Sequence, residues 1–317
     1  MKKLSIVIPV YFNEENLLSL YSDIKEKVID KLPDYKLDYE IVMVDDGSKD
    51  KSYQIMQDLA KIDKKIVLVK LARNFGEHAA TLAGLSVCTG DIAARKAADL
   101  QEPSGMILEM LDEYNKGSKV VLALRKTRQD KWHEKLTSNM YSKIVQKLAL
   151  KNMPDGGVDS YLIDRQVIDF LVNLNQKNSP LTELILWSGF DYASVYYDRQ
   201  KRTAGKSRWT FSKKIKMACD SLFGFSYVPV RFITCIGFIA FILSVIWTIV
   251  LIIRKLVGSI TIDGYTSIII LLLLSFGIVM LSIGIIGEYV WRALDAAKGT
   301  PVFLIDEIKN GDKKKNE

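Results

Sequence analysis

Two stretches without a single charged residue, 233–253 and 266–287, constrain the fold of this chain more than any other feature. The first has 21 residues, and a helix of that length reaches about 31 Å at about 1.5 Å per residue, which matches a hydrocarbon core of about 30 Å. The second is similarly long, and the segment between them is short and contains glycine. The pair therefore predicts a membrane hairpin of two helices.

The basic residues beside these stretches predict their orientation. Lysines and arginines crowd both outer flanks, whereas the connecting segment carries only Arg254 and Lys255. Because cytoplasmic loops are enriched in basic residues, we expect both flanks and both chain ends to be cytoplasmic. The amino terminus turns acidic and polar before a signal peptide could be completed, so we expect no signal peptide.

The segment 209–230 mixes lysines with large apolar residues and stops at Pro229, which predicts an amphipathic helix in the membrane interface. The alternative is an amphipathic helix packed on the soluble part of the chain. We expect a soluble domain over 1–208, the interfacial helix over 209–230, the transmembrane hairpin over 231–290 and a cytosolic tail over 291–317.

Composition excludes several classes of protein. The three cysteines have no paired spacing, and the two histidines form no metal-binding pattern, which excludes a disulfide scaffold and a zinc hydrolase. The net charge of +7 is concentrated beside the apolar stretches. This arrangement fits an anionic membrane surface better than nucleic acid.

The soluble part alternates short apolar runs with helical patterns. Runs rich in β-branched residues cover 4–10, 39–44 and 66–71, and a fourth strand is expected after Gly90. Each run leads into a polar turn and then a helical pattern, with Ser48 expected to cap the second helix. This order predicts a parallel α/β sheet whose ligands bind at the carboxyl ends of the strands.

The turns at those strand ends carry the polar residues. They contain neither a GxGxxG nor a GxxxxGK[ST] sequence, which excludes the common dinucleotide and P-loop sites. Asp45 and Asp46 could accept hydrogen bonds from a nucleoside, and Asp99 could hold a divalent metal that bridges a diphosphate. Taken alone, the Asp45-Asp46-Gly47-Ser48 turn could also be only a turn and a helix cap.

Five motifs in order resemble one family. IVIPVYFNEE, VDDGSKD, RNFG, ADLQEP and RTAGKSRW, followed by two apolar spans, are similar to the polyisoprenyl-phosphate branch of the family 2 glycosyltransferases. The resemblance extends from about Leu4 to Phe303. It implies an α/β GT-A (Rossmann-like) cytosolic domain plus an α-helical membrane domain with an interfacial helix and two transmembrane helices.

The same resemblance implies a reaction and its partners. The reaction is the inverting transfer of a sugar from a UDP-sugar, a UDP-hexose or UDP-N-acetylhexosamine, to undecaprenyl phosphate. The expected location is the bacterial inner membrane, with multiple spans, contact with membrane lipid and a homotetrameric assembly. A lipid-linked product also implies a flippase and a downstream membrane glycosyltransferase as partners.

Site roles follow from the resemblance residue by residue. The positions that match the donor nucleotide turns are Pro9, Tyr11, Glu14, Asp45, Asp46 and Arg73. Asp159 and Asp99 match catalytic carboxylates, and Asp99 with Gln101 matches the turn that holds the metal. The positions that match acceptor or diphosphate contacts are Arg125, Arg128, Arg202, Ser207 and Arg208.

The chain departs from the family pattern at Ala97, where the metal-binding turn ordinarily begins with aspartate. Three outcomes remain open. A divalent metal, Mg²⁺ or Mn²⁺, could still bind through Asp99, Gln101 and the donor diphosphate, which is the outcome we favour. Lys96 or Arg95 could neutralise the diphosphate instead, or the chain could be a weakly active subunit.

The acceptor chemistry limits the role of Asp159. A lipid phosphate has a second pKa of about 6 and is largely anionic at neutral pH, so it needs little help from a base. We therefore expect Asp159 to position the acceptor or to tune its protonation, rather than to act as an obligatory base. Two other functions remain as alternatives, a non-catalytic subunit because of Ala97 and a polysaccharide synthase, although the synthases generally have more spans.

Overall fold

The computed structural model describes residues 1–126, 152–154, 158–174, 179–200 and 264–310, with isolated positions at 146 and 176 and between 233 and 253. The predicted interfacial helix at 209–230 lies outside the described residues, and the first apolar stretch, 233–253, is described only in scattered positions, which are helical.

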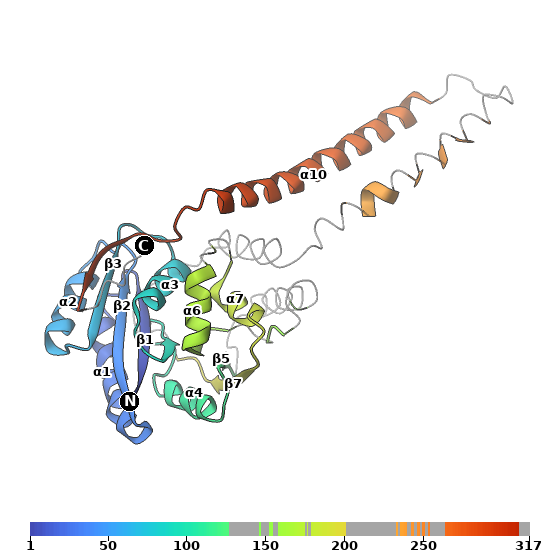
Figure 1. Ribbon diagram of the computed structural model, residues 1–317. Helices are drawn as coiled ribbons and strands as arrows, with labels where there is room; N and C mark the ends of the chain where they lie inside the picture. Colours follow the sequence, from blue (N-terminus) through green and yellow to red (C-terminus); the bar gives the residue numbers. More distant parts are fainter. Residues whose placement is uncertain are drawn as a thin grey trace. The chain divides into compact units, whose positions relative to one another are not determined.

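Among the described residues, eight strands form one sheet in the order β7-β5-β6-β4-β1-β2-β3-β8 (Figure 1). The strands are β1 (Lys2–Val10), β2 (Leu37–Asp45), β3 (Ile66–Leu71), β4 (Ile92–Arg95), β5 (Val120–Arg125), β6 (Ser160–Asp164), β7 (Tyr192–Tyr197) and β8 (Ile305–Lys309). The four central strands β4, β1, β2 and β3 are parallel, β5 and β7 are parallel to each other, and β6 and β8 are antiparallel to their neighbours.

Helices cover both faces of this sheet. They are α1 (Leu17–Lys27), a 3-10 helix (Ile29–Tyr35), α2 (Ser52–Ile62), α3 (Glu77–Val87), α4 (Met106–Asn115), α6 (Arg165–Leu174) and α7 (Leu181–Trp187). The apolar faces of α1, α2 and α4 share one core with Ile6, Ile8 and Met43. Strands β1, β2 and β3 are continuous apolar runs, which is typical of parallel strands that are buried on both faces.

Helix α3 packs closely on the opposite face of the sheet. A Cβ atom at Gly84 would lie 2.4 Å from Val7 Cγ1 and 3.0 Å from Val44 Cγ2, so this contact requires glycine. The close approach fixes the position of α3 and of the turn that precedes it.

The segment 291–317, expected as a cytosolic C-terminal tail, contains regular structure in its described part. Strand β8 pairs with β3 at the edge of the sheet, where Tyr53 donates a hydrogen bond to Glu307 (2.6 Å) and Lys70 pairs with Asp306 (3.1 Å). The described part of this segment therefore belongs partly to the long helix that ends at Ala297 and partly to the sheet, through β8. The chain accordingly divides into two compact units, Met1–Ser221 with Pro301–Glu317, and Leu222–Thr300.

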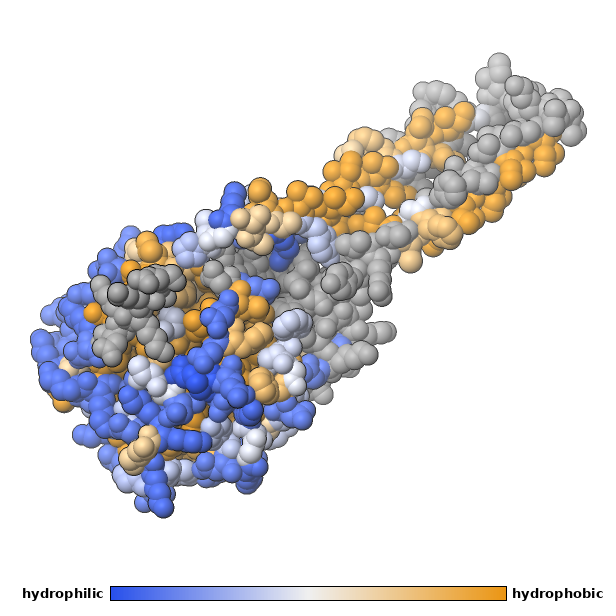
Figure 2. Space-filling view, viewed as in Figure 1, coloured by the Kyte–Doolittle hydropathy of each residue, from blue (hydrophilic) through white to orange (hydrophobic). Residues whose placement is uncertain are grey.

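The second unit contains α10 (Tyr265–Ala297), a helix of 33 residues. It extends the predicted second span beyond residue 287. Within the described residues, Ser275–Ala297 is the one helix stretch whose length and composition would allow it to cross a membrane. Apolar side chains follow α10 along its surface (Figure 2), and Phe276 and Ile286 are examples of exposed ones.

Candidate active site

The turns that follow β1 and β2 are joined by hydrogen bonds. The N–H of Phe12 donates to Ser48 Oγ (3.1 Å), and Glu14 Oε2 accepts the N–H of Lys51 (2.8 Å). Helix α2 begins at Ser52 rather than directly after Ser48, because the hydroxyl of Ser48 binds the β1 turn. Glu14, a predicted donor-site residue, thus connects the first turn to the amino end of α2.

The two predicted nucleoside carboxylates at the end of β2 lie below the surface. Asp45 is fully buried, its Oδ1 accepts the N–H of Ser48 (3.2 Å), and its Oδ2 has no hydrogen-bond partner among the described residues. Burial raises the pKa of Asp45. A buried carboxylate oxygen without a partner is costly, so Asp45 retains the capacity to accept one more donor.

Asp46 fastens the RNFG turn after β3 to the turn after β2. Its carboxylate accepts hydrogen bonds from Asn74 Nδ2 (2.9 Å), Phe75 N–H (2.7 Å) and Gly76 N–H (2.9 Å). Burial raises the pKa of Asp46 to about 6, against the opposing effect of the Phe75 and Gly76 N–H groups. The two turns therefore form one connected surface.

Gly47 permits this connection. Its φ is +73°, and a Cβ atom there would lie 2.7 Å from the backbone N of Asn74 and 2.8 Å from the backbone C of Arg73. Only glycine combines this left-handed conformation with such a close backbone approach. The DDGS sequence thus serves the shape of the turn as well as its chemistry.

The remaining predicted donor residues lie around these turns. Pro9 stands opposite Val44 in the parallel β1–β2 pair. The half-buried Tyr11 ring packs edge-on against Phe12, with ring centroids 4.7 Å apart. The guanidinium of the exposed Arg73 lies 4.4 Å from the centroid of the Phe75 ring.

The acidic turn after β4 contains Asp99 and Gln101. Asp99 Oδ1 accepts the N–H of Gln101 (3.2 Å), and the side-chain oxygen of Gln101 accepts a hydrogen bond from the guanidinium of Arg199. The backbone oxygen of Gln101 also accepts the N–H of Gln200 (2.9 Å). The segment after β7 is thus attached to the acidic turn.

The buried carboxylate of Glu102 supports the same turn. Its carboxylate accepts hydrogen bonds from the N–H of Ala97 (3.1 Å), the hydroxyl of Ser160 (3.0 Å) and the guanidinium of Arg95 (3.1 Å). Glu102 is 6% exposed, so these donors compensate a charge that is almost fully buried. They hold the backbone at Ala97 in place.

Lys96 and Arg95 are both engaged inside the protein. Lys96 is fully buried, donates to the backbone oxygen of Glu102, and has its pKa lowered by burial. Arg95 is 8% exposed and binds Glu77, Glu102 and the backbone oxygen of Asp159. The structure therefore argues against the alternative in which either of these cations neutralises a bound diphosphate.

The predicted acceptor carboxylate, Asp159, is held by two other side chains. Arg125 donates to both of its oxygens, through Nε to Oδ2 and through Nη2 to Oδ1 (2.5 Å), and Tyr197 donates to Oδ2 (2.6 Å). Burial, with the nearby Asp159 charge, raises the pKa of Tyr197. Arg125 ends β5, Tyr197 ends β7 and Asp159 precedes β6, so three strands position this group.

Metal ligands are few on this turn. The side chain of Ala97 offers no ligand atom, Asp99 offers one carboxylate, and the amide oxygen of Gln101 already accepts a hydrogen bond from Arg199. Within the described ranges, no three histidine, cysteine, aspartate or glutamate residues are grouped so that they could hold a metal ion. The side chains present do not fit a metal held by the protein alone, and the expected Mg²⁺ or Mn²⁺ stays a prediction.

The other predicted contacts of the acceptor or diphosphate lie outside the described residues; they are Arg128, Arg202, Ser207 and Arg208. Three residues of the site were missed by the sequence analysis. Tyr197 ends an apolar strand, Glu102 stands inside the quoted ADLQEP motif, and Arg199 precedes Arg202 in the same basic stretch. In the sequence, Tyr197 could have been noticed because it stands at a strand end. Glu102 and Arg199 could have been noticed because they lie in or near the quoted motifs.

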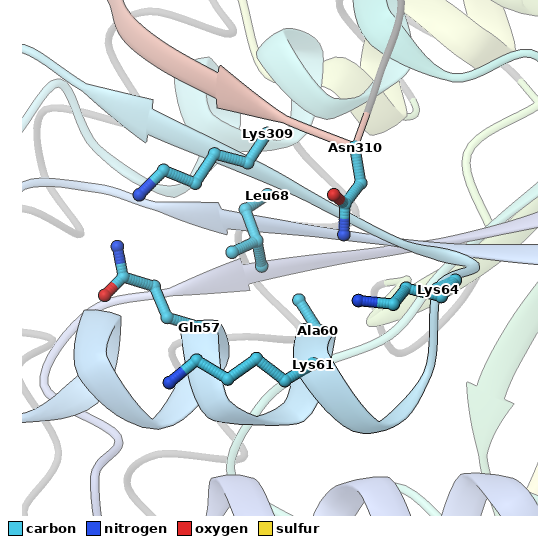
Figure 3. A pocket seen from close by; sticks show the side chains of 7 residues that line it. All are labelled: Gln57, Ala60, Lys61, Lys64, Leu68, Lys309 and Asn310. Atoms are coloured by element: carbon cyan, nitrogen blue, oxygen red, sulfur yellow. The ribbon is translucent and has the colours of Figure 1, made fainter.

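A hollow of about 240 Å³ lies elsewhere, between α2 and β8 near the amino end of β3 (Figure 3). Its lining residues are Gln57, Ala60, Lys61, Lys64, Leu68, Lys309 and Asn310. None of the predicted site residues that the structure describes lines this hollow. The candidate active site is instead the surface formed by the turns after β1, β2, β3 and β4 with Asp159.

Several curated proteins are similar to the chain over nearly its whole length. A glycosyltransferase of Synechocystis sp. is 32% identical over 307 residues, which cover 96% of this chain and 95% of that protein. A prophage bactoprenol glucosyl transferase homolog of Escherichia coli is 30% identical, covering 97% and 99%. The undecaprenyl-phosphate 4-deoxy-4-formamido-L-arabinose transferase of Proteus mirabilis is 28% identical, covering 100% and 97%.

The fold is also similar to that of a solved enzyme. A mannosyltransferase from Pyrobaculum calidifontis, in complex with GDP-Man and Mn²⁺, has a TM-score of 0.50 and 16% identity, covering 70% of this chain and 63% of that one. This similarity confirms the expected Rossmann-like GT-A sheet. The model of the family described as glycosyl transferase family 2 matches residues 5–171. The chain is a glycosyltransferase and belongs to glycosyl transferase family 2.

Proposed function

We propose that the chain transfers a hexose or N-acetylhexosamine from a UDP-sugar to undecaprenyl phosphate, with inversion at the anomeric carbon. The observation that carries the proposal is the Asp159 carboxylate, which Arg125 and Tyr197 hold, while Arg95 joins the Asp159 backbone oxygen to Glu102 of the acidic turn. The relatives from E. coli and P. mirabilis support the acceptor, because their names specify bactoprenol and undecaprenyl phosphate.

Asp159 acts on the acceptor through Arg125. Both Asp159 oxygens already accept hydrogen bonds, and a lipid phosphate is largely anionic at neutral pH. A base is therefore not required, and the carboxylate orients the guanidinium instead. Arg125 then attracts the acceptor phosphate and holds its oxygen toward the anomeric carbon. Its contribution is to orient the phosphate and to compensate its negative charge.

The donor nucleoside binds at the turns after β1, β2 and β3. Asp46 fastens two of these turns together, and the Asp45 carboxylate has one oxygen without a partner among the described residues. Tyr11 and the exposed Arg73 border the same surface. A preformed surface of this kind lowers the entropy lost when the donor binds.

The domain formed by Met1–Ser221 and Pro301–Glu317 works at a membrane that the Leu222–Thr300 unit enters. Sheet strands stand both before and after the Leu222–Thr300 unit, which contains the apolar helix α10. This arrangement supports a pair of spans, and the basic residues on the outer flanks favour the cytoplasmic face for the domain. The homotetramer, the flippase and the downstream glycosyltransferase stay predictions from the family resemblance.

The test uses the purified full chain in detergent with undecaprenyl phosphate and radiolabelled UDP-glucose, UDP-N-acetylglucosamine or UDP-galactose. We expect one donor to give a lipid-extractable product whose sugar has the inverted anomeric configuration by NMR. Arg125→Ala should lower kcat/KM for the lipid by about 10- to 100-fold, because a charge-assisted contact to phosphate is lost.

The control is Lys116→Gln, which removes an exposed charge beside α4 that pairs with Glu113. This variant should retain the activity of the wild-type chain, and Arg125→Ala should retain its affinity for UDP. Loss of UDP affinity in Arg125→Ala would place this arginine at the donor. Absence of a lipid product, despite UDP binding, would refute the proposed acceptor.

A further inference from the structure

The acidic turn that lacks an aspartate at Ala97 has an arginine attached to it. Arg199 donates to the side-chain oxygen of Gln101, and the next residue, Gln200, donates its N–H to the Gln101 backbone oxygen (2.9 Å). The Gln101 amide also lies 3.5 Å from the Gln200 backbone oxygen. These contacts hold the arginine at the turn although Arg199 follows β7, far away in the sequence.

Within the described part of the chain, no acidic side chain neutralises the charge of Arg199. Its side chain is exposed, and its polar partner within the described part of the chain is a neutral amide. Arg95 differs, because it is surrounded by the carboxylates of Glu77 and Glu102. Arg199 is thus a positive charge that the fold has placed at the acidic turn and left accessible.

The turn is also shaped without a metal ion. The Glu102 carboxylate binds the Ala97 N–H, the Ser160 hydroxyl and Arg95, and these bonds fix the backbone on both sides of Ala97. A bound cation is therefore not needed to order this segment. What the turn lacks is positive charge for a diphosphate, and a guanidinium binds phosphate oxygens well through paired N–H donors.

We propose that Arg199 binds the diphosphate of the nucleotide donor and takes the place of a divalent metal at this turn. This inference rests on the proposed function, because it requires a nucleoside diphosphate donor. When the anomeric bond breaks, the bonding electron pair goes to the departing diphosphate oxygen, while an acceptor phosphate oxygen forms the new bond to the sugar. Arg199 stabilises the charge that develops on the departing group.

The test measures the affinity of UDP and of uridine by calorimetry, with the purified full chain, in excess EDTA and in Mg²⁺ or Mn²⁺. Wild type should bind UDP with nearly the same affinity in all three conditions. Arg199→Gln keeps a donor for Gln101 but removes the charge. It should weaken UDP binding by about ten-fold or more, as expected for loss of a charge-assisted hydrogen bond, and should leave uridine binding unchanged.

Two further variants sharpen the result. Arg199→Lys keeps the charge and should retain part of the UDP affinity, whereas the control Lys116→Gln should retain all of it. Ala97→Asp adds a carboxylate, so UDP binding should become weaker in EDTA and stronger in Mn²⁺.

UDP binding that requires metal in wild type, or that Arg199→Gln leaves unchanged, would overturn the role of Arg199 while the proposed function stands. Equal losses of UDP and uridine affinity in Arg199→Gln would also overturn it, since the residue would then act on the whole site. If wild type bound neither UDP nor uridine in any condition, the proposed donor and this inference would both fail.

Discussion

Two opposing influences act on the carboxylate of Asp46. Burial favours its neutral form, and the N–H groups of Phe75 and Gly76 favour the charged form. Burial is the larger influence and raises the pKa to about 6, whereas an unfolded chain has an aspartate pKa of about 3.9. Between these pH values the folded chain holds a proton that the unfolded chain has released, so the free energy of unfolding falls as the pH rises.

This sign gives a prediction for Asp46→Asn. The asparagine does not titrate. The difference in unfolding temperature, wild type minus variant, should therefore decrease between about pH 4 and about pH 6 and stay constant at higher pH. A shift of about two units corresponds to at most about 3 kcal/mol. Scanning calorimetry at several pH values measures the difference between the two proteins. A difference that increased with pH would contradict a pKa dominated by burial.

Arg95 compensates a buried acid. Replacing Arg95 with methionine leaves the Glu102 carboxylate buried without its cation, and breaking a buried pair in this way costs about 3 kcal/mol or more. Arg95→Met should therefore lower the unfolding midpoint strongly. Adding Glu102→Gln should recover part of the loss, because the uncompensated charge is then gone. Additive losses in the double variant would show that Arg95 does not act through Glu102.

At the scale of elements, local patterns were sufficient for the first strands and their turns. β1, β2 and β3 are continuous apolar runs followed by polar turns, so their positions and the turn residues were predictable. The start of α2 was not, because Ser48 binds the Phe12 N–H instead of capping the helix. Tyr197 could not be assigned to Asp159 because the partners come from different strands.

Strand β8 could also not be predicted from local sequence patterns. Its contact from Tyr53 to Glu307 joins residues 254 positions apart in the sequence, and the strand has only 5 residues. It covers the edge of β3, and the Leu304 backbone oxygen accepts the N–H of Ala72, next to the RNFG turn (2.9 Å). The C-terminal segment thus protects a sheet edge and supports the RNFG turn.

Truncation tests this role of β8. A chain that ends at Thr300 exposes the edge of β3, so we expect an unfolding midpoint lower by several degrees and a tendency to aggregate. A chain that ends at Asn310 keeps β8 and serves as the control. Differential scanning calorimetry and light scattering measure both effects. Equal behaviour of the two truncated chains would show that β8 adds nothing to stability.

For the whole molecule, the path of the chain restricts its membrane topology. The sheet contains β7 before the Leu222–Thr300 unit and β8 after it, so the chain enters and leaves that unit from one and the same folded sheet. A chain that leaves and returns to one side crosses an even number of times. If α10 crosses the membrane, a second crossing must precede it, and the uncharged stretch 233–253 is the segment long enough to provide it.

Cysteine labelling in intact cells tests this topology. In a variant with the three native cysteines replaced, single cysteines are introduced at Lys49 in the sheet domain, at Asp306 in β8 and at Ser259 between the apolar stretches. A maleimide that cannot cross the membrane should label only Ser259→Cys, because the basic flanks predict a cytoplasmic sheet domain. After lysis, Lys49→Cys and Asp306→Cys should also react, since both native side chains are exposed. Protection of all three positions in intact cells would mean that α10 does not cross, and opposite labelling of Lys49→Cys and Asp306→Cys would contradict the pairing of β8 with β3.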